Sequence, residues 1–236
     1  MRTQGILGMY MFKAVVFDWD GTLADTKKAV VVSFRKVLAD VGCVVDDEFI
    51  ERRIGTGSRK TLDDALEHCG IVLDNETLEK LVRRKVGLQA ELSTIVNLFE
   101  GATALLNALH GRTKIALATM SSRKVIYRLL SEKRIEKYFD VVITADEILK
   151  PKPDPGIFLL SATELNVLPR DCVIIEDSVF GVKAAREAGM KCIAIPSGAY
   201  TKDELRNENP DLLVDSITEK EKILDFIFEE HLYTTR

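Results

Sequence analysis

The chain has 236 residues, 46% hydrophobic and 30% charged, which is typical of a globular protein with a main domain and a smaller companion. A net charge of −4 argues against a nucleic-acid or anionic-membrane surface, since such surfaces need a clustered basic excess. No apolar run approaches the roughly 18 residues of a membrane span, and no protein partner can be inferred. A small phosphorylated metabolite needs only a few well-placed cations and is not excluded.

The N-terminal segment is apolar but is interrupted by Lys13 and has no small-residue cleavage site. We interpret it as a short extension that runs into a first strand, rather than as a signal peptide. Four cysteines lie far apart and form no metal-ligand pattern: Cys43, Cys69, Cys172 and Cys192. We therefore expect core-packing thiols in a reducing environment and a cytoplasmic protein.

Short apolar runs, most of them rich in Val and Ile, predict the buried strands of a parallel sheet. In chain order they cover residues 14–17, 115–118, 141–143, 173–175 and 193–195, with an edge strand expected at 212–214. Helical patterns lie between and after them, at residues 102–110, 122–133, 157–165, 179–188 and 219–231. This alternation predicts an α/β fold, a Rossmann-like open parallel sheet with helices on both faces.

One long stretch after the first strand shows helical patterns and no strand signal. Its helices are expected at residues 26–41, 47–53, 59–69 and from 77 to about 94. The stretch is too long for a loop in a compact domain and has apolar faces of its own. We therefore predict an inserted all-α cap domain at 26–95, with the α/β core formed by 11–25 and 96–236.

Polar side chains follow four of the predicted strands, at the sheet edge where ligands bind in open α/β folds. They are Asp18, Asp20 and Thr22 after the first strand, Thr119 and Ser121 after the second, Lys152 after the third, and Glu176 and Asp177 after the fourth. Carboxylates, hydroxyls and a lysine are the groups that a Mg²⁺–phosphate site needs.

The pair Asp18 and Asp20 is the most specific of these signals. Two residues apart on an extended chain, both side chains point to the same side, so one could attack phosphorus while the other handles protons. A lone Asp-x-Asp is more often a turn or a helix cap, and Asp25 is expected mainly to cap the next helix. Thr119 alone would equally suit a helix cap. The four strand ends together favour a phosphate-transfer site.

At these residues the sequence resembles the haloacid dehalogenase superfamily of phosphohydrolases, over nearly the whole chain. The motifs are FDWDGTLADT (17–26), ALAT (116–119), KPDPGIF (152–158) and IIEDSVFG (174–181). The resemblance implies that Asp18 is the nucleophile, Asp20 the general acid/base, and Thr119 and Lys152 the phosphate ligands. It implies Mg²⁺ as the cofactor, bound by Asp18, the backbone of Asp20, Glu176 and Asp177. Thr22 and Ser121 are expected to contact the substrate.

The proline-rich loop offers two lysines, and Lys152 matches the family's spacing better than Lys150. The motif IIEDSVFG (174–181) resembles that of the β-phosphoglucomutase-like branch, whereas phosphoglycolate phosphatases more often carry an Asp at the position of Gly181. Sugar mutases of this branch place a histidine where this chain has Val30. We therefore expect a Mg²⁺-dependent phosphatase acting on a small phosphomonoester, with a phosphosugar mutase as the alternative.

In the cap, the segment 55–60 contains two glycines followed by Arg59 and Lys60, which could bind a second anionic group of the substrate. A flexible turn with solvated basic residues is the alternative. Two other classes of protein remain open. A phospho-receiver domain also uses Asp, Thr and Lys at strand ends, but the cap and Asp20 weigh against it. A catalytically silent binding protein would not need the full set of site residues.

Overall fold

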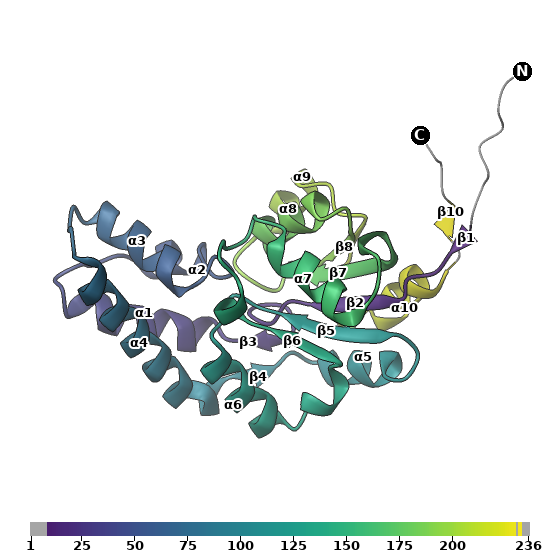
Figure 1. Cartoon of the computed structure of the whole chain (residues 1–236), viewed down its shortest axis with the longest axis horizontal. Coiled ribbons are helices and arrows are strands. Elements are labelled where there is room, and N and C mark those ends of the chain that lie inside the picture. The colour runs from purple at the N-terminus through teal and green to yellow at the C-terminus, as the bar shows by residue number, and fades with distance from the viewer. Residues whose placement is uncertain (1–8, 230, 233–236) are drawn as a thin grey trace, which may run out of the picture.

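The computed structural model describes residues 9–229 and 231–232 (Figure 1). Its central sheet has six parallel strands in the order β6-β5-β2-β7-β8-β9. Their bounds are β2 Ala14–Phe17, β5 Lys114–Ala118, β6 Val141–Ile143, β7 Cys172–Glu176, β8 Lys191–Ala194 and β9 Leu212–Leu213. The first of these strands in the sequence, β2, lies in the middle between β5 and β7, which is the Rossmann strand order. The predicted α/β fold is confirmed.

Helices cover both faces of this sheet because alternate strand residues point to opposite sides. Val15 and Phe17 of β2 belong to a buried cluster with α5, α6 and α10, whereas Ala14 and Val16 belong to a second cluster with α7, α8 and α9. These helices are α5 Ala102–Leu109, α6 Arg123–Lys133, α7 Gly156–Leu165, α8 Val179–Glu187, α9 Lys202–Asn207 and α10 Lys220–Phe228. In Figure 1, α8 and α9 lie above β2 and β5, and α5 and α6 lie below them.

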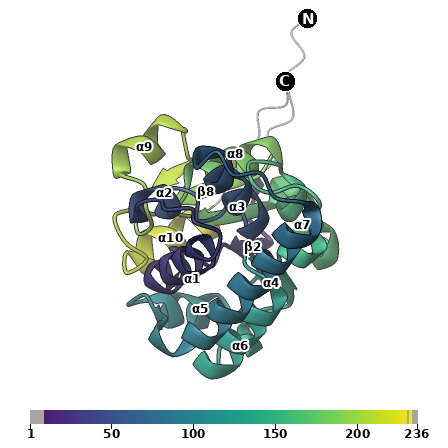
Figure 2. The same ribbon diagram turned by 90° about the vertical axis from the view of Figure 1, so that its left-hand side faces the viewer.

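Four α-helices lie within residues 26–95 and form the region that we call the cap. They are α1 Lys27–Ala39, α2 Asp47–Glu51, α3 Ser58–His68 and α4 Asn75–Glu91. Apolar side chains such as Phe34 and Leu62 form a buried cluster of their own there. Figure 2, viewed from the cap side, shows α1, α3 and α4 in front of β2. The domain boundaries at 26 and 95 remain a prediction.

Several short elements escaped the sequence analysis. The chain enters and leaves the cap through two paired strands, β3 Ala24–Asp25 and β4 Asn97–Leu98. Strand β1 Met9–Tyr10 pairs with β10 His231–Leu232, so the helix predicted over 219–231 is wrong at its end and stops at Phe228. Strand pairs of two residues have too little sequence to show a period.

The cap entrance also corrects the role expected of Asp25. Thr26 is the residue that precedes α1, and its side chain makes no capping hydrogen bond. The Asp25 carboxylate instead accepts from the backbone N–H of Lys27 at 3.3 Å. Asp46 and Asp74 do cap α2 and α4, each accepting from a backbone N–H at 2.7 Å.

The cysteine interpretation is wrong for one pair. Cys43, after α1, and Cys69, after α3, form a disulfide that joins two segments of the cap. Cys172 and Cys192 are free and buried in the sheet, as expected. Sequence spacing could not show the bond, because the two cysteines meet only once α1 and α3 pack together.

Two expectations concern the ends of the chain and membranes. Residues 1–8, which carry most of the proposed N-terminal extension, lie outside the described residues. Among the helices within residues 9–229, none is long and apolar enough to span a bilayer.

Candidate active site

The end of β2 places two aspartates beneath the cap. Asp18 and Asp20 are both buried, and Trp19 between them is turned into the core, as the alternation of a strand requires. Gly21 has φ = 88°, and a Cβ there would lie 2.3 Å from Oδ2 of Asp177. Only glycine therefore allows the chain to turn at this point.

Lys152 reaches the same place from the loop after β6. Its ammonium lies 2.6 Å from Oδ1 of Asp18 and also donates to the Glu176 carboxylate. Burial alone would lower the pKa of Lys152, but the two carboxylates raise it above its usual value, so the ammonium stays charged. Lys150, the other candidate, is exposed.

The end of β7 contributes two further acids with different surroundings. Oε2 of Glu176 accepts from the backbone N–H groups of Asp177 and Ser178, both at 3.0 Å. A Cβ at Gly181 would lie 1.9 Å from the Glu176 carboxyl carbon, so this glycine makes room for the longer acid. Asp177 accepts from the Thr22 hydroxyl at 2.9 Å, which leaves Thr22 as a support for Asp177.

The end of β5 fixes Asp20. Oδ2 of Asp20 accepts from the hydroxyls of Thr119 at 3.2 Å and Ser121 at 2.7 Å. Its other oxygen, Oδ1, is buried without a hydrogen-bond partner among the described residues. The carboxylate is thus held by one oxygen, while the second has no hydrogen bond within the described residues.

Eight of the ten candidate residues therefore meet at one edge of the sheet: Asp18, Asp20, Thr22, Thr119, Ser121, Lys152, Glu176 and Asp177. We call the four acids among them the carboxylate cluster: Asp18, Asp20, Glu176 and Asp177. Arg59 and Lys60 do not join them.

The carboxylate cluster is suited to a divalent cation. Oxygen atoms of Asp18, Glu176 and Asp177 lie within 4.8 Å of one another, and all three residues are buried. Burial and the neighbouring acids raise the pKa of Asp18 and Asp177 well above the usual value, although Lys152 opposes this. Lys152 forms ion pairs with only two of the four buried acids, and a bound Mg²⁺ would offset the excess negative charge with the oxygen ligands that it prefers.

The cap contributes a buried lysine that the sequence analysis missed. The Lys85 ammonium donates to Gln89 at 2.5 Å and Ser58 at 3.1 Å, and lies 4.2 Å from the ring centre of Phe34. Burial lowers the pKa of Lys85 to about 8, and the negative charge of Asp20 opposes that shift. No described residue forms an ion pair with Lys85, so its charge is available to a ligand.

A signal for Lys85 was present in the sequence. The buried residues of α4 include Leu78, Leu81, Lys85 and Gln89, which lie on one face of the helix at intervals of three or four. A lysine within such an apolar stripe is unusual and merits a functional explanation.

Arg59 and Lys60 instead pair with acids of the cap. Arg59 forms ion pairs with Asp63 and Glu79, and Lys60 lies 2.5 Å from Asp64. These contacts neutralise both cations on an exposed helix face, in line with the solvated alternative.

Two neighbouring spaces lie between the cap and the core. An inner pocket is lined by Asp20, Ser121, Val30 and Lys85, among others. An outer cavity of about 700 Å³ is lined by residues of both parts, including Arg59 and Lys60. Gly57, Ser58 and Met120 line both spaces, so the two meet where the cap touches the core.

Comparison with known proteins agrees with this geometry. The haloacid dehalogenase-like hydrolase profile matches residues 15–195, which include the ends of β2, β5 and β7 and the whole cap. The chain belongs to the haloacid dehalogenase-like hydrolase family.

Curated members of this family give more detail. A phosphorylated carbohydrates phosphatase of Thermotoga maritima is 33% identical over 77% of this chain and 83% of its own length. The fructose-1-phosphate phosphatase YqaB of Escherichia coli is 31% identical over 78% of this chain and 96% of its own. A solved β-phosphoglucomutase of Clostridium difficile superposes with a TM-score of 0.82 at 28% identity, covering 92% of this chain and 97% of that one.

Proposed function

We propose that this member of the family is a Mg²⁺-dependent phosphatase that hydrolyses a small phosphomonoester, such as a sugar phosphate, through an aspartyl-phosphate on Asp18. The observation that carries the proposal is the buried contact of Lys152 with Asp18 and Glu176. One oxygen of Asp18 is held by the ammonium, and the second can attack phosphorus. The names of the curated phosphatase relatives point to the same reaction class.

Asp20 handles the protons of both half-reactions. Thr119 and Ser121 hold its Oδ2, so the unpartnered Oδ1 can give a proton to the leaving alcohol. The resulting Asp20 carboxylate then takes a proton from the water that attacks the phosphorus of phospho-Asp18. Release of inorganic phosphate restores both aspartates.

Charge near the transferred phosphoryl group is balanced from two sides. Lys152 supplies one fixed positive charge. Asp18 and Asp177 would hold Mg²⁺, which, when bound, neutralises the negative charge of the phosphoryl oxygens. Glu176 has its Oε1 on Lys152 and its Oε2 on backbone N–H groups, so its main role in this proposal is to orient the lysine.

The cap recognises the alcohol part of the substrate. Lys85 faces the inner pocket and can bind an anionic or hydroxyl oxygen, while the outer cavity has room for the body of a small metabolite. Val30 lines the inner pocket, and no histidine within the described part of the chain does so. This supports hydrolysis rather than the phosphate transfer of a sugar mutase.

A panel of phosphomonoesters tests the proposal, with inorganic phosphate measured in Mg²⁺ and in excess EDTA. We expect Mg²⁺-dependent release from at least one sugar phosphate. β-Glucose 1-phosphate should give inorganic phosphate rather than glucose 6-phosphate, as followed by ³¹P NMR. A stable phosphoprotein formed from acetyl phosphate without phosphate release would show a receiver-type protein instead.

A further inference from the structure

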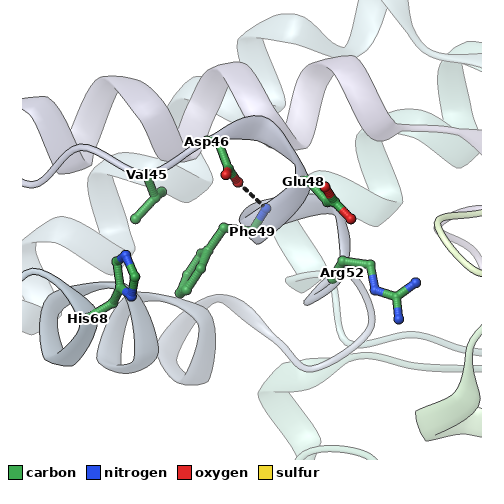
Figure 3. A pocket seen from close by; sticks show the side chains of 6 residues that line it. All are labelled: Val45, Asp46, Glu48, Phe49, Arg52 and His68. Atoms are coloured by element: carbon green, nitrogen blue, oxygen red, sulfur yellow. Dashed lines mark hydrogen bonds between the residues drawn. The ribbon is translucent and has the colours of Figure 1, made fainter.

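Arg52, directly after α2, extends out of the cap toward the core. Its two terminal nitrogens lie 2.6 and 3.1 Å from the Glu204 carboxylate of α9, and one of them donates to the backbone carbonyl of Ala199 at 3.3 Å. Figure 3 shows its guanidinium pointing away from Phe49 and His68, with which Arg52 lines a small pocket of the cap. Among the ion pairs described for residues 9–229, Arg52–Glu204 alone connects residues 26–95 to the rest of the chain.

Tyr200 adds two contacts to the same arginine. The guanidinium carbon of Arg52 lies 4.3 Å from the centre of the tyrosine ring, and the Tyr200 hydroxyl donates to the Arg52 backbone carbonyl at 2.6 Å. Glu204 is itself fixed, because its carboxylate accepts from the Thr201 backbone N–H at 2.9 Å. The side chain and the backbone of Arg52 are thus both bound to the core.

The loop that receives Arg52 also touches the carboxylate cluster. The Ser197 hydroxyl donates to the backbone carbonyl of Gly21 at 2.6 Å. The backbone of Gly198 lies so close to Asp177 that a Cβ there would stand 1.7 Å from Oδ2. Residues 197–200 therefore lie between the cap arginine and an acid proposed to bind the metal.

We propose that Arg52, Glu204 and Tyr200 form a latch that holds the cap against the loop 197–200, so that cap position and the placement of Asp177 are coupled. Arg52 is a positioning residue, because it touches none of the four acids. Opening of the cap would release the loop and loosen the packing of Gly198 on Asp177. The effect on turnover rests on the proposed function, whereas the latch itself does not.

Hydrogen exchange of the backbone amides tests the latch without any need for activity. In Arg52→Met and Glu204→Gln, we expect exchange about two- to fivefold faster in α2, in residues 197–200 and at Asp177, the range for loss of one partly exposed ion pair. Asp47→Asn is the matched control, since its 3.0 Å pair with Arg35 lies within the cap. It should leave the amides of residues 197–200 and of Asp177 unchanged.

The double variant separates a latch from two unrelated structural effects. If the two residues act through each other, adding Glu204→Gln to Arg52→Met should change exchange no further. Additive effects, or unchanged exchange at residues 197–200 and Asp177 in both single variants, would overturn the proposal. Thermal melting of each variant confirms that it is folded.

Calorimetric titration with Mg²⁺ provides a second readout of the coupling. The Mg²⁺ dissociation constant should rise about two- to fivefold in Glu204→Gln, in proportion to the lost ion pair, and stay constant in Asp47→Asn. An unchanged constant in a Glu204→Gln protein whose loop exchanges faster would overturn the link to Asp177. If the wild-type protein binds no Mg²⁺, that result would count against the proposed function. The rate of hydrogen exchange at Asp177 in the variants would still show whether the latch exists.

Discussion

The charged side chains of the core and those of the cap differ in how they are paired at the site. On the core side, Lys152 is buried between Asp18 and Glu176, and hydroxyls or backbone N–H groups bind Asp20, Glu176 and Asp177. On the cap side, the buried Lys85 has no acid partner among the described residues, while the exposed Arg59 and Lys60 pair with cap acids.

This difference suggests a division of work between the two sides. A cluster held by this many ion pairs and hydrogen bonds has little freedom to change its shape, which suits a reaction step with fixed geometry. A buried cation without an acid partner is stabilised when a ligand supplies a negative charge or a hydrogen-bond acceptor, which suits substrate recognition. Substitutions in the core should therefore reduce turnover on every substrate, and substitutions in the cap should act mainly through substrate binding.

The largest effect is expected for Asp18→Asn. An amide cannot attack phosphorus as a carboxylate does, so phosphate release should fall by roughly 10³-fold or more while the fold is kept. Phosphate release and circular dichroism measure the two properties. Near-normal release by a folded variant would exclude Asp18 as the nucleophile.

Lys152→Ala should lower kcat by about 10²- to 10³-fold, the usual effect of removing one charge-stabilising donor. Lys150→Ala is the control from the same loop and should change kcat little, because Lys150 is exposed. Both values come from initial rates at saturating substrate and Mg²⁺. If Lys150→Ala lowered kcat and Lys152→Ala did not, the family motif would be aligned with this loop two residues too far along the chain.

Reduction of the Cys43–Cys69 disulfide should separate stability from catalysis. Opening a cross-link of this kind typically costs about 2–4 kcal/mol of unfolding free energy, and the loss should fall on the cap. Denaturant unfolding with and without reductant, and of Cys43→Ser, measures it. Phosphate release at 25 °C should be unchanged, since neither cysteine belongs to the carboxylate cluster or lines the inner pocket. A large loss of turnover on reduction would show that the disulfide shapes the site itself.

The smallest effect is expected for Lys85→Met, a loss of about tenfold in kcat/KM, comparable to one hydrogen bond to a charged group. Arg84→Ala is the control, because Arg84 lies on the exposed face of α4 and pairs with Asp40 of the cap; it should change kcat/KM by about twofold or less. Equal losses in the two variants would contradict the assignment of recognition to Lys85.

The pH profile gives an independent check on Lys85. Its pKa is lowered to about 8, so the positive charge is present below that pH and is lost as the pH rises through it. Since kcat/KM reports groups of the free enzyme, its value for wild-type protein should fall above pH 8. The Lys85→Met profile should lack this step, and the same step in both proteins would assign it to another group.

The core side could be predicted in detail because its information is local. Each short Val/Ile run specifies a buried strand, and the residue that follows it must lie at the carboxyl edge of the sheet. That reasoning predicts from the sequence alone that Asp18, Asp20, Thr119 and Glu176 lie together. The preference for Lys152 over Lys150 came instead from the spacing of the family's motif, and the structure buries the first and exposes the second.

The cap side could not be predicted in the same way. A basic residue on a helix faces either the ligand or solvent, and only the packing of the helices decides which. Arg59 and Lys60 turned toward cap acids, whereas Lys85, which lies within the apolar stripe of α4, was buried over the inner pocket. The roles of Thr22 and Ser121 as supports for Asp177 and Asp20 likewise depend on distances between separate loops.

The sequence by itself determined the α/β fold, the family and the groups at the strand ends, because strand periodicity and strand-end motifs are short-range properties. Tertiary structure alone decided the contacts between segments far apart in the chain. These include the Cys43–Cys69 bond, the unpaired state of Lys85 and the contact of Arg52 with Glu204. The physical reason is that each depends on how two helices or loops pack, which no single segment encodes.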